Sequence, residues 1–229
     1  MFGVADYTIQ SNDQVIGRTY NRRQNSLTIR YPCVCENCNT GWMSQSEQMV
    51  IPTLKPMISG NHPSRLSRHD QYALALWVTL RSMIFDAYSA KDSIEYFTQE
   101  ERVSFAKSHD VPLNGSRMWI ASMVKDWGGA QFSHQAAVTP DKNLGIKVTT
   151  CVIGQTALQM FHCKGDDPVT VFGDNITLDL NKLSTPAWQP IVAQIWPRRF
   201  VNRWPLQQLT EAGFYAFIDR FGLKFSHQL

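Results

Sequence analysis

The chain contains 229 residues with a mass of 26.1 kDa, which suits one large domain or two small ones. Hydrophobic residues make up 43% and charged residues 18%, a composition that excludes an intrinsically disordered chain. A net charge of +3 is too small to indicate nucleic-acid binding by itself. The longest apolar run, residues 73–80, is too short to cross a bilayer, and the opening residues lack a secretory signal pattern. We therefore expect a cytoplasmic protein without a membrane partner.

The first part of the chain carries short alternating runs that predict a small antiparallel β-meander. Polar turns separate these runs, and the last run leads directly into a turn that contains three cysteines. The expected strands lie at residues 4–9, 14–18 and 26–31.

The middle of the chain has the periodicity of helices. Pro52 and Pro56 are expected to bend or divide the first of them, because proline cannot donate a backbone hydrogen bond. Thr98 and Glu101 form a predicted capping box at the start of the last one. The expected helices span residues 39–59, 67–88 and 98–108.

Alternating segments return in the C-terminal half and predict an antiparallel sheet with a closing helix. The fold class that follows is α+β. A region over residues 1–60 holds the cysteine turn, and an α+β body covers residues 61–229, the two together forming one compact domain. The expected strands lie at residues 117–123, 131–138, 145–153, 156–163 and 191–196, and the helix at 210–221.

The five cysteines form two groups. Cys151 and Cys163 lie in predicted strands and are expected to be inert core residues, because a lone cysteine behaves as a small hydrophobe. Cys33, Cys35 and Cys38 crowd one turn, and the CxxC spacing lets two thiolates reach one tetrahedral metal ion. These three residues are the candidate zinc ligands. The alternative is a turn that keeps its shape without metal, since residues 1–32 contain neither Cys nor His.

The run that starts at Cys35 and ends at Glu47 resembles a motif of HNH endonuclease-like proteins that reads CxxCNxGWMxxxE. In that family the motif is the C-terminal half of the ββα-metal fold. The resemblance extends from about residue 26 to the C-terminus. It includes the segment 54–60, Trp77, the segment 117–121 and the Trp-Pro pairs at 196–197 and 204–205.

The resemblance also implies which residues would carry chemistry. In the family an upstream CxxC completes a structural zinc site, and an acidic–His pair supplies the base beside a catalytic divalent ion such as magnesium. Neither has a match here, because the first histidine, His62, follows the cysteine turn. Asn39 matches the family's final metal-binding position and is the one catalytic candidate, although a single amide cannot hold a catalytic ion alone. Glu47 is expected to be a supporting or capping carboxylate.

Two hypotheses for the function follow. The first is a non-catalytic nucleic-acid- or protein-binding protein on an HNH-nuclease-like scaffold, from a phage, mobile-element, defence or anti-defence system. The second is a metal-dependent DNA endonuclease, or a fragment of one, whose base comes from an unexpected residue, a second subunit or an upstream sequence. The pattern of aromatic residues is compatible with a homodimer.

Four arginines near the N-terminus form the candidate nucleic-acid-binding group. Beside a ββα motif they could grip phosphates, and the alternative is a solvated hairpin tip. A second group of basic and aromatic residues could bind a partner, or could instead pack over the edge of the apolar core. The first group is Arg18, Arg22, Arg23 and Arg30, and the second is Arg198, Arg199, Arg203 and Trp204.

Overall fold

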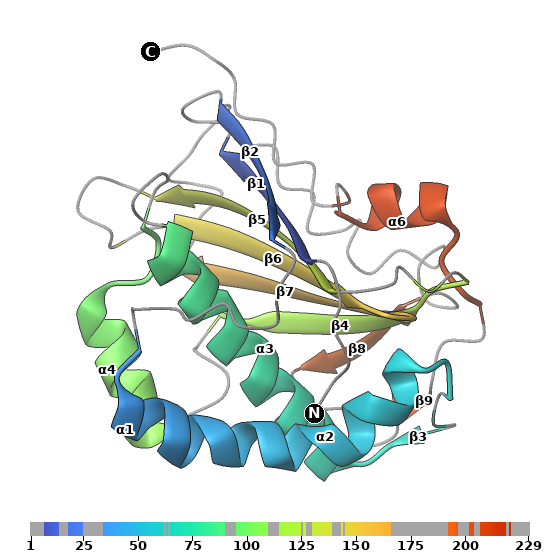
Figure 1. The fold of residues 1–229 in the computed structure, drawn as a ribbon, viewed down its shortest axis with the longest axis horizontal. Coiled ribbons are helices and arrows are strands. Elements are labelled where there is room, and N and C mark those ends of the chain that lie inside the picture. Colours follow the sequence, from blue (N-terminus) through green and yellow to red (C-terminus); the bar gives the residue numbers. More distant parts are fainter. Residues whose placement is uncertain are drawn as a thin grey trace.

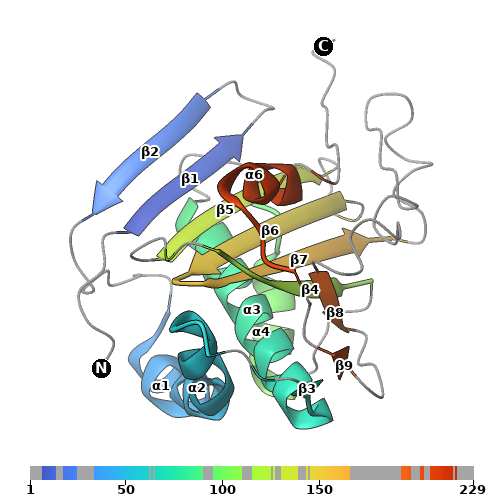
Figure 2. The same ribbon diagram turned by 90° about the vertical axis from the view of Figure 1, so that its right-hand side faces the viewer.

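A computed structural model of the chain provides the fold (Figure 1). A large twisted sheet lies between helix α3 on one face and helix α6 on the other, and helices α2 and α4 pack on the α3 side (Figures 1 and 2). The structure describes residues 7–13, 18–24, 34–61, 63, 65–89, 95–109, 115–124, 126, 130–138, 143, 145–165, 192–196, 202–203, 207–218 and 220.

The elements follow the order in which the sequence predicts strands, helices and then strands again. The strands are β1 (Tyr7–Asp13), β2 (Arg18–Gln24), β3 (Arg65–Leu66), β4 (Arg117–Ser122), β5 (Ala130–Val138), β6 (Gly145–Ile153), β7 (Thr156–Lys164), β8 (Val192–Trp196) and β9 (Asn202–Arg203). The helices are α1 (Glu36–Cys38), the π-helical turn η1 (Asn39–Met43), α2 (Ser44–Ile58), α3 (Arg68–Ser89), α4 (Gln99–Ser108) and α6 (Glu211–Ile218).

The large sheet has the strand order β2-β1-β5-β6-β7-β4-β8. Its five C-terminal strands are antiparallel, as the sequence predicts, and β6 and β7 are joined by a tight turn at Gly154. Gly154 has φ +53°, and a Cβ there would lie 2.4 Å from the Ile58 carbonyl oxygen. That oxygen accepts a hydrogen bond from the Gln155 N–H at 3.0 Å. A side chain at position 154 would therefore push the end of α2 away from the sheet.

The N-terminal hairpin differs from the predicted meander in the bounds of its strands and in its pairing with the large sheet. The first two strands lie at 7–13 and 18–24 instead of 4–9 and 14–18, so the polar residues at 11–13 continue a strand instead of forming a turn. The backbone groups of such residues are satisfied by the neighbouring strands whatever their side chains prefer. Because β1 pairs with β5 in parallel, the hairpin extends the large sheet. The predicted strand at 26–31 falls outside the described residues.

The predicted helices are present, but the first of them, expected at 39–59, is not bent or divided at Pro52 and Pro56 as predicted. Helix α2 continues through Pro52 and Pro56, both of which are exposed. Prolines on the outer side of a helix remove only hydrogen bonds whose carbonyls can reach water. The backbone instead departs from helical geometry at Gly41, with φ −90° and ψ −114°. The capping box is confirmed, with the Glu101 N–H donating to Thr98 Oγ1 at 3.2 Å and the Thr98 N–H donating to Glu101 Oε2 at 2.7 Å.

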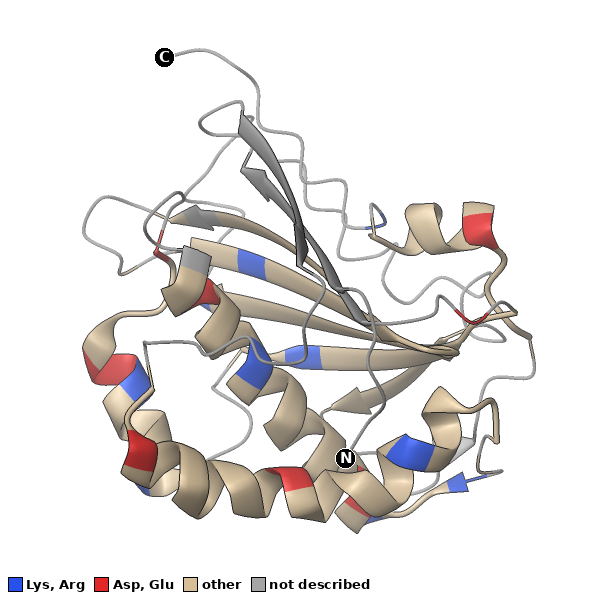
Figure 3. Cartoon of the chain, viewed as in Figure 1, with Lys and Arg blue, Asp and Glu red and all other residues tan. Residues whose placement is uncertain are grey.

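Two apolar clusters hold the layers together. The main cluster lies between the helices and one face of the sheet, and both predicted regions contribute to it, as Val50 and Leu54 of α2 meet residues of α3. The smaller cluster lies beneath α6, where Phe214 and Phe217 cover Trp119 and Phe161. Charged residues are more frequent on the helices than on the coloured strands β4 to β8 of the sheet (Figure 3). Within the described part of the chain, no helix combines the length and apolar character needed to cross a membrane.

One ion pair crosses the main core. Lys147 of β6 donates to Asp86 of α3, with Nζ 2.6 Å from Oδ1, and both side chains are 0% exposed. The backbone N–H groups of Tyr96 and Phe97 donate to the same carboxylate at 3.1 and 2.8 Å. Burial alone would raise the pKa of Asp86, but Lys147 and these N–H groups lower it below its usual value. The Asp86 carboxylate therefore stays charged inside the core.

Replacing Asp86 with Asn should lower the free energy of unfolding by about 3–5 kcal/mol, because it leaves the Lys147 ammonium buried without a counter-charge. Lys147→Met should be similarly costly. The double variant should lose less than the sum of the two single losses, by about 0.5–3 kcal/mol, since the two groups are in direct contact. Urea denaturation followed by circular dichroism measures all three values.

The exposed Glu211→Gln substitution on α6 serves as a control and should stay within about 0.5 kcal/mol of the unsubstituted protein. Strictly additive losses for the Asp86 and Lys147 substitutions would contradict the coupling between these two side chains.

Candidate functional site

The cysteine turn lies at the start of the helical segment that continues into α2. Cys35 precedes α1, and its Sγ accepts a hydrogen bond from the Cys38 backbone N–H at 3.3 Å. The Asn39 N–H donates to the Cys35 carbonyl oxygen at 3.0 Å and closes the first helical turn. Cys35 is exposed, whereas Cys38 is half-buried and packs against the main core.

The two thiols have unequal acidity because they interact with each other. Hydrogen bonding by the Cys38 thiol and the Cys38 backbone N–H lowers the pKa of Cys35. The hydrogen bond with Cys35 and partial burial raise the pKa of Cys38. Cys35 is therefore the sulfur that carries negative charge first.

The turn brings together two of the three predicted zinc ligands. Cys33 lies outside the described residues. Across the part of the chain that the structure describes, no group of three or more His, Cys, Asp and Glu side chains is gathered as a metal site. Cys35 and Cys38 therefore fit half of a tetrahedral zinc site, which needs two further ligands.

The motif residues that follow the turn have different surroundings. Asn39 is exposed, and Met43 is buried in the main core. Trp42 is half-buried, with its ring 5.8 Å from Phe105 in an edge contact and 4.8 Å from His109 in a stacked contact. Nε1 of Trp42 and Nε2 of His109 are buried and have no hydrogen-bond partner among the residues that the structure describes. Sequence reasoning did not connect His109 with the motif, because no spacing pattern links it to the cysteines.

Glu47, the last residue of the motif, forms an ion pair with Arg81 of α3. The Arg81 guanidinium also lies 5.4 Å from the centre of the Trp77 ring. A hydrogen bond of 2.6 Å from Thr53 Oγ1 to Asp70 Oδ1 joins the same two helices. The Glu47 side chain is 46% exposed, so this ion pair adds little to the apolar packing of Val50 and Leu54 that holds α2, and with it the cysteine turn, against α3.

The candidate arginines are only partly within the described residues. Arg18, Arg22 and Arg23 all lie on β2, the edge strand of the large sheet, and Arg18 stands opposite Asp13 in the register. Arg203 lies on β9, opposite Arg65 of β3. The other candidates, Arg30, Arg198, Arg199 and Trp204, fall outside the described residues.

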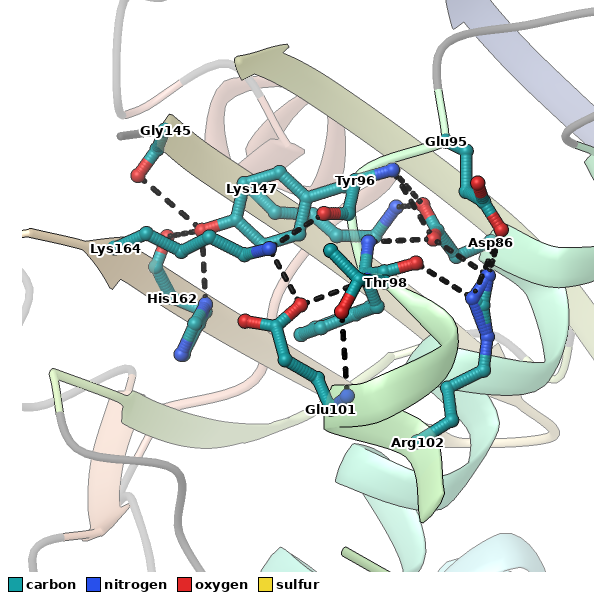
Figure 4. A network of polar contacts seen from close by, with 11 residues as sticks. Asp86, Glu95, Tyr96, Thr98, Glu101, Arg102, Gly145, Lys147, His162 and Lys164 are labelled. Atoms are coloured by element: carbon teal, nitrogen blue, oxygen red, sulfur yellow. Dashed lines mark hydrogen bonds and ion pairs between the residues drawn. The ribbon is translucent and has the colours of Figure 1, made fainter. Parts of the chain in front are cut away.

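A larger set of ionisable groups is buried between α4 and the sheet, and sequence reasoning missed it (Figure 4). The Tyr96 hydroxyl lies 2.8 Å from His162 Nδ1. Lys164 donates from Nζ to the Tyr96 carbonyl oxygen at 2.7 Å and to Glu101 Oε2 at 2.5 Å. Arg102 pairs with Glu95 at the rim. Tyr96 is 0% exposed, so its hydrogen bonds are shielded from water. Because Lys164 belongs to β7 and Glu101 to α4, their contact holds α4 against β7.

The other two described cysteines, Cys151 and Cys163, lie on β6 and β7 of the large sheet. Cys151 is buried in the main core, where burial raises the pKa of its thiol. Cys163 is half-buried, and its Sγ donates to the Lys164 carbonyl oxygen at 3.7 Å. The expectation of a core role is confirmed for Cys151 by its burial.

Comparison of the chain with protein-family models, curated proteins and solved structures gave no match. The resemblance to HNH endonuclease-like proteins therefore stays a prediction from the motif residues.

His134 of β5 adds a pH-sensitive group to the buried face of the sheet. Burial and the neighbouring Lys147 lower the pKa of His134 to about 3, against an opposing effect of Asp86. Between this value and the ordinary pKa near 6.5, only the unfolded chain binds the proton. Stability therefore falls as the pH decreases through this range.

We expect His134→Gln to weaken this pH dependence. One such group contributes a slope of up to about 1.4 kcal/mol per pH unit, which the variant should lack between roughly pH 4 and 6. Urea denaturation at several pH values compares the two proteins. The exposed His69→Gln substitution on α3 should keep the original slope. Equal slopes for His134→Gln and the unsubstituted protein would refute the assignment.

Proposed function

We propose that this protein is a non-catalytic nucleic-acid-binding protein on an HNH-nuclease-like scaffold, from a phage, mobile-element or defence-related system. The observation that carries the proposal is that the cysteine turn is exposed at the surface on a helix that is anchored in the core. Cys35, Asn37 and Asn39 are exposed, while α2, which follows them, is anchored in the core by Val50 and Leu54. A surface turn on a rigid support is suited to meet a large ligand.

The edge strand β2 supports a nucleic-acid ligand. It carries three arginines among its seven residues, Arg18, Arg22 and Arg23. The planar guanidinium bonds phosphate in a bidentate manner, and such contacts position a protein on nucleic acid without reading its sequence. We therefore assign to β2 contacts with the sugar–phosphate backbone of the nucleic acid.

The residues around the turn favour binding over hydrolysis. Cleavage of a phosphodiester at a one-metal site needs a base that activates water and a cation that stabilises the charge on phosphorus. Asn39 is an amide and cannot accept the proton of water. His109, the described histidine in contact with the motif, stacks on Trp42 with its Nε2 buried.

Zinc has a structural part in this proposal, in which the turn and α2 form part of a ββα-metal motif. Cys35 and Cys38 would supply two thiolates and Cys33 a third, and a bound ion would hold the turn rigid. Elemental mass spectrometry should find about one zinc per chain, or one per two chains if a homodimer shares the site. The double variant Cys35→Ser/Cys38→Ser should lose it, whereas Cys163→Ser should retain it. Zinc-free protein purified without chelator would remove zinc from the proposal.

Fluorescence anisotropy with labelled DNA and RNA duplexes at low salt tests the binding itself. We expect affinity that falls with salt and that drops at least about tenfold in Arg22→Glu/Arg23→Glu, because phosphate contacts release counterions. The double variant Arg65→Glu/Arg117→Glu makes the same charge change at exposed positions elsewhere and should bind nearly as well as the unsubstituted protein.

Two outcomes would overturn the proposal. No binding at low salt would leave a protein partner as the ligand. Cleavage of plasmid DNA with magnesium or manganese that is lost in Asn39→Ala would establish the endonuclease hypothesis instead.

A further inference from the structure

We propose that Cys35 and Cys38 form a redox-active dithiol, which low-molecular-weight disulfides such as oxidised glutathione convert into an intramolecular disulfide. The inference concerns a covalent modification of the cysteine turn. It stands independently of the nucleic-acid ligand proposed above, because the state of the thiols is measured directly.

The first argument is the proximity of the two side chains. Cys35 Sγ folds back to 3.3 Å from the Cys38 backbone nitrogen, and the hydrogen bond from the Asn39 N–H to the Cys35 carbonyl oxygen keeps the residues on one turn. By helix geometry, Cα atoms three residues apart on a turn are about 5 Å apart, which lies within the roughly 4.4–6.8 Å that a disulfide bridges. Cys35 has extended backbone before α1, with ψ 154°, so the adjustment that brings the two Cβ atoms to disulfide distance falls on Cys35 and not on α2.

The second argument is the difference in access. Cys35 is exposed, and so are the two residues that follow it, Glu36 and Asn37, which leaves Cys35 open to a small reagent. Cys38 is half-buried and packs against the core beside Trp42. The reagent disulfide therefore reacts with Cys35 first. Cys38, one turn away, is the resolving thiol that then attacks the mixed disulfide on Cys35.

The third argument is the number of partners that each chemistry requires. A tetrahedral zinc site needs four ligands, of which the described part of the turn supplies two, Cys35 and Cys38. A disulfide needs only two sulfurs, and both are present on the turn. Of the other described cysteines, Cys151 is buried, and Cys163 of β7 is half-buried like Cys38 but does not share a turn with a second cysteine.

The exchange balances without a further reactant. The Cys35 thiolate attacks one sulfur of the reagent disulfide, forms a mixed disulfide and releases one reagent thiolate. The Cys38 thiol gives its proton to solvent, and its thiolate attacks the Cys35 sulfur and expels the second reagent thiolate. Two protein thiols are oxidised, and one reagent disulfide is reduced to two thiols. The product cannot donate thiolates, so the disulfide and a zinc ion at this turn exclude each other.

Mass spectrometry of the full chain tests the proposal. Chelator-treated protein is equilibrated in glutathione buffers from reducing to oxidising, and the remaining thiols are trapped with N-ethylmaleimide before proteolysis. We expect a Cys35–Cys38 bridge in oxidising buffer, reversal by dithiothreitol, and alkylated Cys151 and Cys163 after denaturation. Cys33→Ser should form the same bridge.

Two variants separate the roles of the sulfurs. Cys38→Ser should stop at the mixed disulfide on Cys35. Cys35→Ser should react roughly tenfold more slowly, because the remaining thiol is less accessible. Circular dichroism confirms that each variant is folded. The proposal is overturned if Cys35 and Cys38 both remain alkylatable in oxidising buffer, if the unsubstituted protein stops at the mixed disulfide, or if the bridge includes Cys33.

Discussion

The Asp86 carboxylate is the contact on which the arrangement of this molecule depends. It lies on α3 inside the main core, where it binds Lys147 of β6 and the backbone N–H groups of Tyr96 and Phe97 (Figure 4). Arg102 of α4 lies 3.9 Å away. A buried charge is tolerated only when it is paired and hydrogen-bonded. Helix α3, the sheet and the segment that leads into α4 must therefore all be in place together.

The position of α3, which the Asp86 contacts set, also determines where the cysteine turn lies at the surface. Ser82, one turn before Asp86 on α3, lies 2.7 Å from Thr149 of β6 through their hydroxyl oxygens, which places the helix along the strand. Helix α2 is held in the same core by Val50 and Leu54, and its Glu47 also pairs with Arg81 of α3. Because the cysteine turn continues into α2, its position at the surface follows from contacts made deep in the core.

A turn held in this way can remain exposed without losing its shape, which suits both proposed roles. The proposed binding of nucleic acid would use the rigid support beneath the turn, and the proposed thiol exchange would use the difference in access between Cys35 and Cys38. The two thiols can serve a metal ion or a disulfide but not both at once. Under the two proposals together, the oxidation state of the turn would decide whether the thiols bind zinc or form a disulfide.

The sequence by itself determined the α+β class, the helices α3 and α4, the strands of the C-terminal sheet and the CxxC turn. These features depend on periodicity, capping and spacing, which are local properties. Only the tertiary structure decided that β1 joins β5, that Glu47 meets Arg81, and that Asp86 and Lys147 pair in the core. Such contacts join residues far apart in the chain, and their side chains look like ordinary surface charges until burial gives each one a partner.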